Sequence, residues 1–195
     1  MSKIFNGLEK YKEKIALVDI DNKEYSYDEI LRKVQKISHK VQKGTLILFL
    51  SSNILESVTG YISFIRNNNI LILLDKSFEK KFVEKMINNY QPSFIYKPKN
   101  YFLKNYINKS LYNGDQYELL RTNFKLKKNF NKNNFLLLTT SGSTQNPKLV
   151  RLSEENVLNN TKRIVKYLKI NSNNTTITTM PMAYSYGLSI INTFI

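Results

Sequence analysis

Short runs made only of apolar residues are the feature of this chain that most constrains its fold. LILFL spans residues 46–50 and ILILL spans residues 70–74. Each run is far shorter than the roughly 20 residues needed to cross a bilayer. A strand with one face in water alternates apolar and polar residues, whereas a strand of a parallel sheet is buried on both faces and is apolar throughout. These runs therefore predict parallel strands whose two faces are covered by helices.

Helical patterns separate the apolar runs. Three segments read as helices, and each begins with a Ser or Asn of the kind that caps a helix start. The predicted helices are residues 26–41, 53–69 and 77–91, with starts at Ser26 with Glu29, Asn53 with Glu56, and Ser77. Predicted strands at 15–21 and 92–96 complete an alternation of strand and helix. This alternation predicts a three-layer α/β fold, with a largely parallel sheet flanked by helices.

The second half of the chain is less regular. Residues 97–133 are rich in lysine and asparagine and predict an irregular segment with at most short strands. The later predicted elements are strands at 133–141, 148–152 and 175–180 and a helix at 153–168. The apolar run from Leu188 to Ile195 is compatible with a helix but has neither a cap nor a following strand. This ending predicts that residues 1–195 are one partial domain, cut in the middle of an element.

Composition excludes several kinds of site. The chain has no cysteine, which removes disulfides, thiolate metal sites and cysteine nucleophiles. Its single histidine, His39, lies in a lysine-rich helical segment, so neither a zinc site nor a histidine-based triad is expected, and we assign no metal ligand. The N-terminal residues contain no continuous apolar stretch typical of a signal peptide. We expect a cytoplasmic protein.

The net charge of +15 raises the hypothesis of a nucleic-acid or membrane-surface binder. The excess is almost all lysine, because only five of the 30 basic residues are arginine. Nucleic-acid surfaces favour arginine, whose planar fork matches phosphates and guanine edges. We therefore interpret the charge as a solvated lysine surface and expect neither nucleic acid nor membrane as a partner, with the surface binder kept as a minor alternative.

A loop rich in hydroxyl groups follows the predicted strand at 133–141. The stretch TTSGSTQNPK, residues 139–148, combines hydroxyls, one glycine and a lysine. Such a loop can present hydroxyls, backbone N–H groups and a positive charge to an anion. It is not a Walker loop, because Pro147 stands at the second glycine and Leu149 at the Ser or Thr that would bind magnesium.

The loop resembles the phosphate-binding signature of the adenylate-forming enzymes: acyl-CoA synthetases, aryl ligases and nonribosomal adenylation domains. The family pattern is approximately [ST]-S-G-[ST]-[ST]-G-x-P-K-G-V, followed by a short strand and a helix that carries an asparagine. The matching residues are Thr140, Ser141, Gly142, Ser143, Thr144, Pro147, Lys148, Val150 and Asn156. Gln145 and Leu149 depart from the pattern, since each replaces a glycine.

Other segments resemble the same family in the same order. YSYDEI, residues 25–30, is similar to an early TY-x-E-L segment, and residues 44–75 are similar to a strand–Asn–helix–strand block, with Asn69 where a glycine is common. MPMAYSYGLS, residues 180–189, is similar to a motif on the acyl-substrate side. In that motif Tyr184 takes the position of a histidine or aromatic residue, and Tyr186 with Gly187 form the Tyr-Gly pair.

The resemblance implies a two-step ligase. A carboxylic acid is activated with ATP and Mg²⁺ as an acyl-adenylate, and the acyl group then passes to a thiol of coenzyme A or of a carrier protein's phosphopantetheine. The implied ATP phosphate site consists of Thr140, Ser141, Gly142, Ser143, Thr144 and Lys148, and the implied acyl pocket includes Tyr184, Tyr186 and Gly187.

The family's adenine and ribose motifs and its C-terminal catalytic lysine have no counterpart in these 195 residues, so no catalytic residue is assigned. We expect weak or no activity from this chain alone, with the missing C-terminal half as a hypothetical separate chain. A non-catalytic nucleotide- or phosphate-binding module is the main alternative. The acyl substrate itself is not predicted.

Overall fold

The structure is a computed structural model that describes residues 2–103, 105–126, 135–139 and 149–195. Its helices are η1 Leu8–Tyr11 (a 3₁₀ helix), α1 Tyr27–Ser38, α2 Leu55–Arg66, α3 Lys80–Tyr90, α4 Glu154–Leu168 and α5 Ser185–Phe194. Its strands are β1 Ile15–Val18, β2 Glu24–Ser26, β3 Leu46–Ser51, β4 Ile70–Asp75, β5 Phe94–Pro98, β6 Ile107–Asn113, β7 Tyr117–Thr122, β8 Leu136–Thr139 and β9 Leu149–Leu152.

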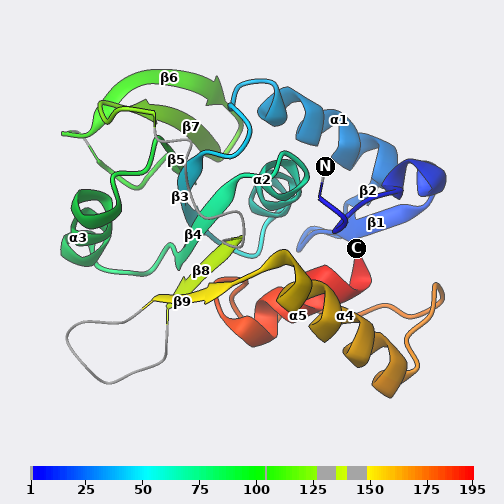
Figure 1. Ribbon diagram of the computed structural model, residues 1–195. Helices are drawn as coiled ribbons and strands as arrows, with labels where there is room; N and C mark the ends of the chain where they lie inside the picture. The colour runs from blue at the N-terminus through cyan, green and yellow to red at the C-terminus, as the bar shows by residue number, and fades with distance from the viewer. Residues whose placement is uncertain (1, 104, 127–134, 140–148) are drawn as a thin grey trace.

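A seven-stranded sheet forms the centre of the molecule, in the order β6-β7-β5-β3-β4-β8-β9 (Figure 1). The four central strands β5, β3, β4 and β8 are parallel. The pairs at both edges, β6–β7–β5 on one side and β8–β9 on the other, are antiparallel. The predicted sheet with a parallel centre, flanked by helices, is confirmed.

Helices cover both faces of the sheet, which explains why β3 and β4 are apolar throughout. Alternate side chains such as Phe49 and Leu73 belong to the core shared with α1, α2, α4 and α5. Their neighbours, such as Leu48 and Ile72, belong to a second core shared with α3. Figure 1 shows α3 on one side of the sheet and α2, backed by α1, on the other. The predicted three layers are confirmed.

Two elements differ from the predicted alternation. β1 is shorter than the predicted strand at 15–21 and pairs only with β2, in a separate two-stranded sheet. Both of its terminal residues are exposed, unlike those of the central strands. The segment 97–133, predicted to be irregular, contains the hairpin β6–β7, which extends the main sheet antiparallel to β5.

Two of the predicted helix caps are wrong. The capping box of Ser26 and Glu29 is present at the start of α1. α2 has Ile54 as its N-cap, with no side-chain cap bond, so the predicted cap at Asn53 is not formed. α3 likewise begins only after Glu79, again without a side-chain cap bond. The backbone N–H of Ser77 instead donates to the Asp75 carboxylate, at 2.9 Å, in the preceding turn.

The predicted strand at 175–180 does not form among the described residues. All residues from 171 to 180 are exposed, and the segment pairs with no described strand. The run TTITTM has the β-branched composition of a strand, but that preference is realised only when a neighbouring strand and a packed face are present.

α4 and α5 lie below the sheet in Figure 1 and pack on each other. The hydroxyl of Tyr61 in α2 donates to Oδ1 of Asn192 in α5 at 2.9 Å, and the Tyr27 hydroxyl donates to the carbonyl of Ile195 at 3.1 Å. No helix in the described part of the chain is long and apolar enough to cross a membrane.

Candidate functional site

The carboxyl ends of three parallel strands meet at one edge of the sheet. β3 and β4 run in register from Leu46 beside Ile70 to Ser51 beside Asp75, and β8 runs parallel on the other side of β4. Ligands of open α/β sheets bind at the carboxyl edge of the strands. This edge is therefore the candidate site.

Polar side chains of β3 and β4 at this edge are occupied by structural contacts. In β3 the Ser51 hydroxyl donates to the Leu74 carbonyl at 3.1 Å, and in β4 the Asp75 carboxylate accepts from the Ser77 N–H at 2.9 Å. Just after β3, the Ser52 hydroxyl lies 2.8 Å from the Tyr117 hydroxyl. Within the described ranges, no group of three or more His, Cys, Asp or Glu side chains is placed to hold a metal ion.

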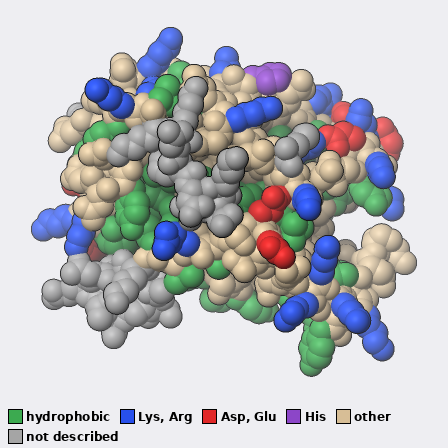
Figure 2. Space-filling model, in the orientation of Figure 1, with side chains coloured by type: hydrophobic (Ala, Val, Ile, Leu, Met, Phe, Trp, Pro, Cys, Tyr) green, Lys and Arg blue, Asp and Glu red, His purple; other side chains and the backbone are tan. Residues whose placement is uncertain are grey.

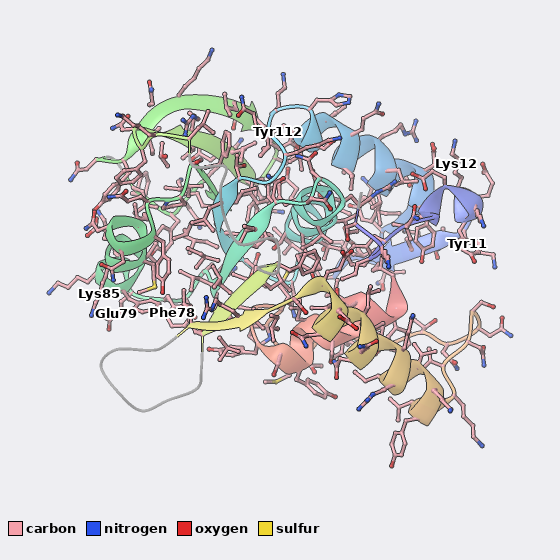
Figure 3. The ribbon with its side chains drawn as sticks, viewed as in Figure 1. Tyr11, Lys12, Phe78, Glu79, Lys85 and Tyr112 are labelled. Carbon is pink, nitrogen blue, oxygen red and sulfur yellow. The ribbon has the colours of Figure 1, made fainter. Side chains whose placement is uncertain are left out.

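The hydroxyl-rich loop leaves and returns at this edge. The loop residues Thr140, Ser141, Gly142, Ser143, Thr144 and Lys148 lie outside the described residues. The structure places the two ends: Thr139 of β8 pairs with Leu149 of β9 across the antiparallel ladder. Leu149 packs against the same apolar core as Phe78, which precedes α3 (Figure 3). Residues 140–148 thus begin at the carboxyl end of β8, one strand from β4.

The asparagine after the loop is part of a helix cap. Asn156 and Ser153 form a capping box at the start of α4, in which the Ser153 backbone N–H donates to Asn156 Oδ1 at 2.9 Å and the Asn156 N–H donates to Ser153 Oγ at 3.1 Å. The predicted helix start at Ser153 is confirmed. The cap gives Asn156 a local role that needs no ligand.

The predicted acyl-pocket residues lie together at the start of α5. Tyr184 is the N-cap, with 37% of its surface exposed, and Tyr186 is 63% exposed. Gly187 is buried, and a Cβ atom there would lie 2.3 Å from the Pro181 carbonyl oxygen and 2.6 Å from that of Met180. Gly187 is therefore required for close backbone packing, while the two tyrosine side chains remain accessible.

Asn53 connects the sheet edge to this tyrosine turn. Its Nδ2 donates to the carbonyls of Thr178 at 2.9 Å and Met180 at 2.8 Å, and its Oδ1 accepts from the Met182 N–H at 3.0 Å. The predicted capping role is replaced by contacts with residues more than 120 positions away. Sequence reasoning missed this role because an Asn that follows a buried strand and precedes a helix has the pattern of a cap.

Glu56, the other residue of that predicted cap, holds the β6–β7 turn. Its buried carboxylate accepts from the backbone N–H groups of Asp115, Gln116 and Tyr117. A Cβ atom at Gly114 would lie 1.9 Å from Glu56 Oε1, so the turn can approach the carboxylate only with glycine at that position. Burial raises the pKa of the Tyr117 phenol to about 12, and its hydrogen bond to Ser52 opposes that rise.

Comparison with known proteins agrees with the geometry. The family model for AMP-binding enzymes matches residues 5–195, almost the whole chain. The chain belongs to the AMP-binding enzyme family. No curated protein matches the AMP-binding chain in sequence.

Solved structures show the same fold. An o-succinylbenzoate coenzyme A synthetase (MenE) from Bacillus subtilis, in complex with AMP, superposes with a TM-score of 0.76 at 17% identity, over 99% of this chain and 53% of that one. The same enzyme with ATP and magnesium gives 0.75 at 16% identity, over 99% and 55%. ATP-bound MatB from Rhodopseudomonas palustris gives 0.73 at 15% identity, over 97% and 42%. The AMP-binding chain thus spans about half the length of these proteins or less.

Proposed function

We propose that this AMP-binding chain holds the phosphates of ATP with residues 140–148 and forms the first part of a ligase that activates a carboxylic acid as an acyl-adenylate. The main support is the family match over residues 5–195, together with the origin of the loop at the carboxyl end of β8. The proposal includes later transfer of the acyl group to a thiol of coenzyme A or of carrier-protein phosphopantetheine, and a cytoplasmic location, where ATP is supplied.

In this proposal the loop acts electrostatically. Hydroxyls and N–H groups of Thr140, Ser141, Gly142, Ser143 and Thr144 donate to the β- and γ-phosphates, and Lys148 offsets charge as pyrophosphate departs. Mg²⁺ in such sites is held largely by substrate phosphates and water. The acyl group would lie against Tyr184, Tyr186 and Gly187.

The family's adenine and ribose motifs have no counterpart in this sequence, and the solved structures extend to about twice this length. We therefore propose that the chain alone is weakly active or inactive and that a further segment, in the same or a separate polypeptide, completes the site. The same half-length coverage supports the alternative of a nucleotide-binding module without turnover.

A binding titration tests the phosphate site. We expect saturable binding of Mg·ATP, weakened about ten- to a hundredfold by Lys148→Ala, the range for losing a hydrogen bond to a charged group. Lys162→Ala, at an exposed lysine of α4, is the matched control and should bind as the wild type does. Equal affinities for all three proteins would contradict the proposal.

The proposed inactivity has its own test. ATP–pyrophosphate exchange is measured with benzoate and with o-succinylbenzoate as probes, and we expect none above background. Carboxylate-dependent exchange by the 195-residue chain would overturn the inactivity while supporting the ligase chemistry.

The charge-driven surface binder makes a different prediction. Figure 2 shows lysine and arginine side chains spread around the visible face, without one continuous patch. A nucleic-acid binder would show affinity that falls steeply with salt and no particular dependence on Lys148.

A further inference from the structure

The segment that leads to the tyrosine turn has little support of its own. Residues 171–180 are exposed throughout and belong to no helix or strand. Ile177, in the middle of the segment, is 75% exposed. Met182 and Ala183, directly after it, are almost fully buried. The chain therefore passes from water into the core within a few residues, and a small number of contacts must set its path.

Asn53 makes three of those contacts, with the hydrogen-bonding pattern of a neighbouring strand. Its partners are the carbonyls of Thr178 and Met180 and the N–H of Met182, which are two residues apart along the chain. In extended backbone, polar groups of alternate residues point to the same side. The side-chain amide of Asn53 thus bonds to the segment as the backbone of a neighbouring strand would, through both its donor and its acceptor group.

α5 and α2 also restrict the segment. The carbonyls of Met180 and Pro181 lie where a Cβ of Gly187 would be, so α5 has approached as closely as glycine allows. The Ser57 hydroxyl of α2 donates to the sulfur of Met182 at 3.3 Å. The Tyr184 N–H donates to the Pro181 carbonyl at 3.1 Å and closes the turn from which α5 begins.

We propose that Asn53 is a positioning residue for the tyrosine turn: by holding residues 178–182 it sets where Tyr184 and Tyr186 stand relative to the carboxyl edge of β3. A role of Asn53 in acyl-substrate binding rests on the proposed function, whereas its role in holding the tyrosine turn does not. Asn53 acts on the two tyrosines through the backbone of residues 178–182, to which it is hydrogen-bonded.

Methionine methyl groups report on this segment directly. The chain has four methionines, of which Met180 and Met182 lie in the held segment and Met86 lies in α3 on the other face of the sheet. In NMR spectra of the ligand-free chain with ¹³C-methyl methionine, Asn53→Ala should shift the Met180 and Met182 signals and leave Met86 in place. Asn159→Ala, at an exposed asparagine of α4, should shift none of them.

Asn53→Asp is the second variant, close to isosteric. It keeps an acceptor for the Met182 N–H but places a carboxylate against two carbonyls, so the same two signals should shift. Hydrogen exchange of peptides covering 178–187 should accelerate about tenfold in both variants, as expected for loss of a hydrogen bond of ordinary strength. The proposal would be overturned if Asn53→Asp gave the spectra and the exchange rates of the wild type. An equal shift of the Met86 signal would also overturn it, because that shift would indicate a general loss of stability.

Adding benzoate separates this proposal from the proposed function. A benzoate-induced shift of the Met180 signal in the wild type that is weakened in both Asn53 variants supports both. Failure of benzoate to shift any signal, with the ligand-free differences present, would contradict the acyl pocket and leave the positioning role supported.

Discussion

Helices α2 and α4 both follow a strand of the main sheet, yet they are stabilised in opposite ways. In α2 ten of the twelve residues are buried, and no side chain caps its start. In α4 only Val157 of fifteen residues is buried, and a complete capping box closes its start. α2 is held by distant parts of the chain, through Glu56 and Tyr61, whereas the start of α4 is capped by its own neighbours in sequence. One distant contact adds to that cap, because the Glu154 carboxylate accepts from the Ser2 hydroxyl at 2.5 Å.

The difference shows why local patterns succeed at one helix and fail at the other. At an exposed helix start few other segments compete for the first N–H groups, so a capping residue of the first turn stabilises them. A buried start is surrounded by other segments whose N–H and C=O groups also need partners. There Asn53 and Glu56 bond to those segments instead.

The largest contrast is expected between two glutamates at the same helical position. Glu56 and Glu155 are each the second residue of their helix, so their interactions with the helix dipole are alike. Glu56→Ala leaves three backbone N–H groups without an acceptor and should lower the free energy of unfolding by about 3–5 kcal/mol. Glu155→Ala should change it by less than about 1 kcal/mol. Urea unfolding measures both, and similar losses would remove the contrast.

Alkaline pH should lower the free energy of unfolding through Tyr117, whose backbone N–H donates to Glu56 of α2. The folded-state pKa of Tyr117 is raised from 10.0 to about 12, so its contribution to stability is complete below pH 10 and is lost as pH rises towards 12. The loss for this one phenol approaches about 3 kcal/mol. Tyr117→Phe should remove that part of the decline in urea-unfolding free energy, with Tyr167→Phe, at an exposed site of α4, as control. An unchanged decline in Tyr117→Phe would contradict the effect of burial.

Replacing a poor helix former by alanine should change the stability of the fold in opposite directions in the two helices. A Cβ at Gly60 in α2 would lie 2.3 Å from Cε1 of Tyr96, whose ring is fully buried. Gly60→Ala should therefore destabilise the fold by about 1–3 kcal/mol, in spite of alanine's better helix propensity. Asn159→Ala in exposed α4 should stabilise it by a few tenths of a kcal/mol. Thermal unfolding tests the signs, and a gain for Gly60→Ala would show that the ring can move.

The smallest loss is expected at the α4 cap. Ser153→Ala should cost about 1 kcal/mol, because it removes the acceptor for the Asn156 N–H. Ser172→Ala, at an exposed serine beyond α4, should have almost no effect. Helical circular dichroism during urea unfolding can follow both variants. Equal stability of the two would mean that α4 is held mainly by its contacts with α5.

Segments that depend on local partners could be predicted from the sequence, and segments that depend on distant partners could not. The apolar runs of β3 and β4 predicted the parallel centre, because strands covered on both faces leave a clear local signal. The hairpin β6–β7 and the roles of Asn53 and Glu56 depend on partners far away in sequence, which no local pattern encodes. The run at 175–180 has the composition of a strand but lacks a described partner. At the site, Tyr184, Tyr186 and Gly187 lie together at the start of α5, as neighbours in sequence must. Their acyl-pocket role and the phosphate-binding roles from Thr140 to Lys148 remain predictions.

Hydrogen exchange of the whole chain with and without Mg·ATP tests the central claim most directly, because it locates bound nucleotide without assuming where it binds. The account predicts slower exchange in peptides that cover residues 139–149, and loss of that protection in Lys148→Ala. No protection there at saturating ATP, or protection confined to peptides of α1, which carries Lys33 and Lys36, would contradict phosphate binding by the loop.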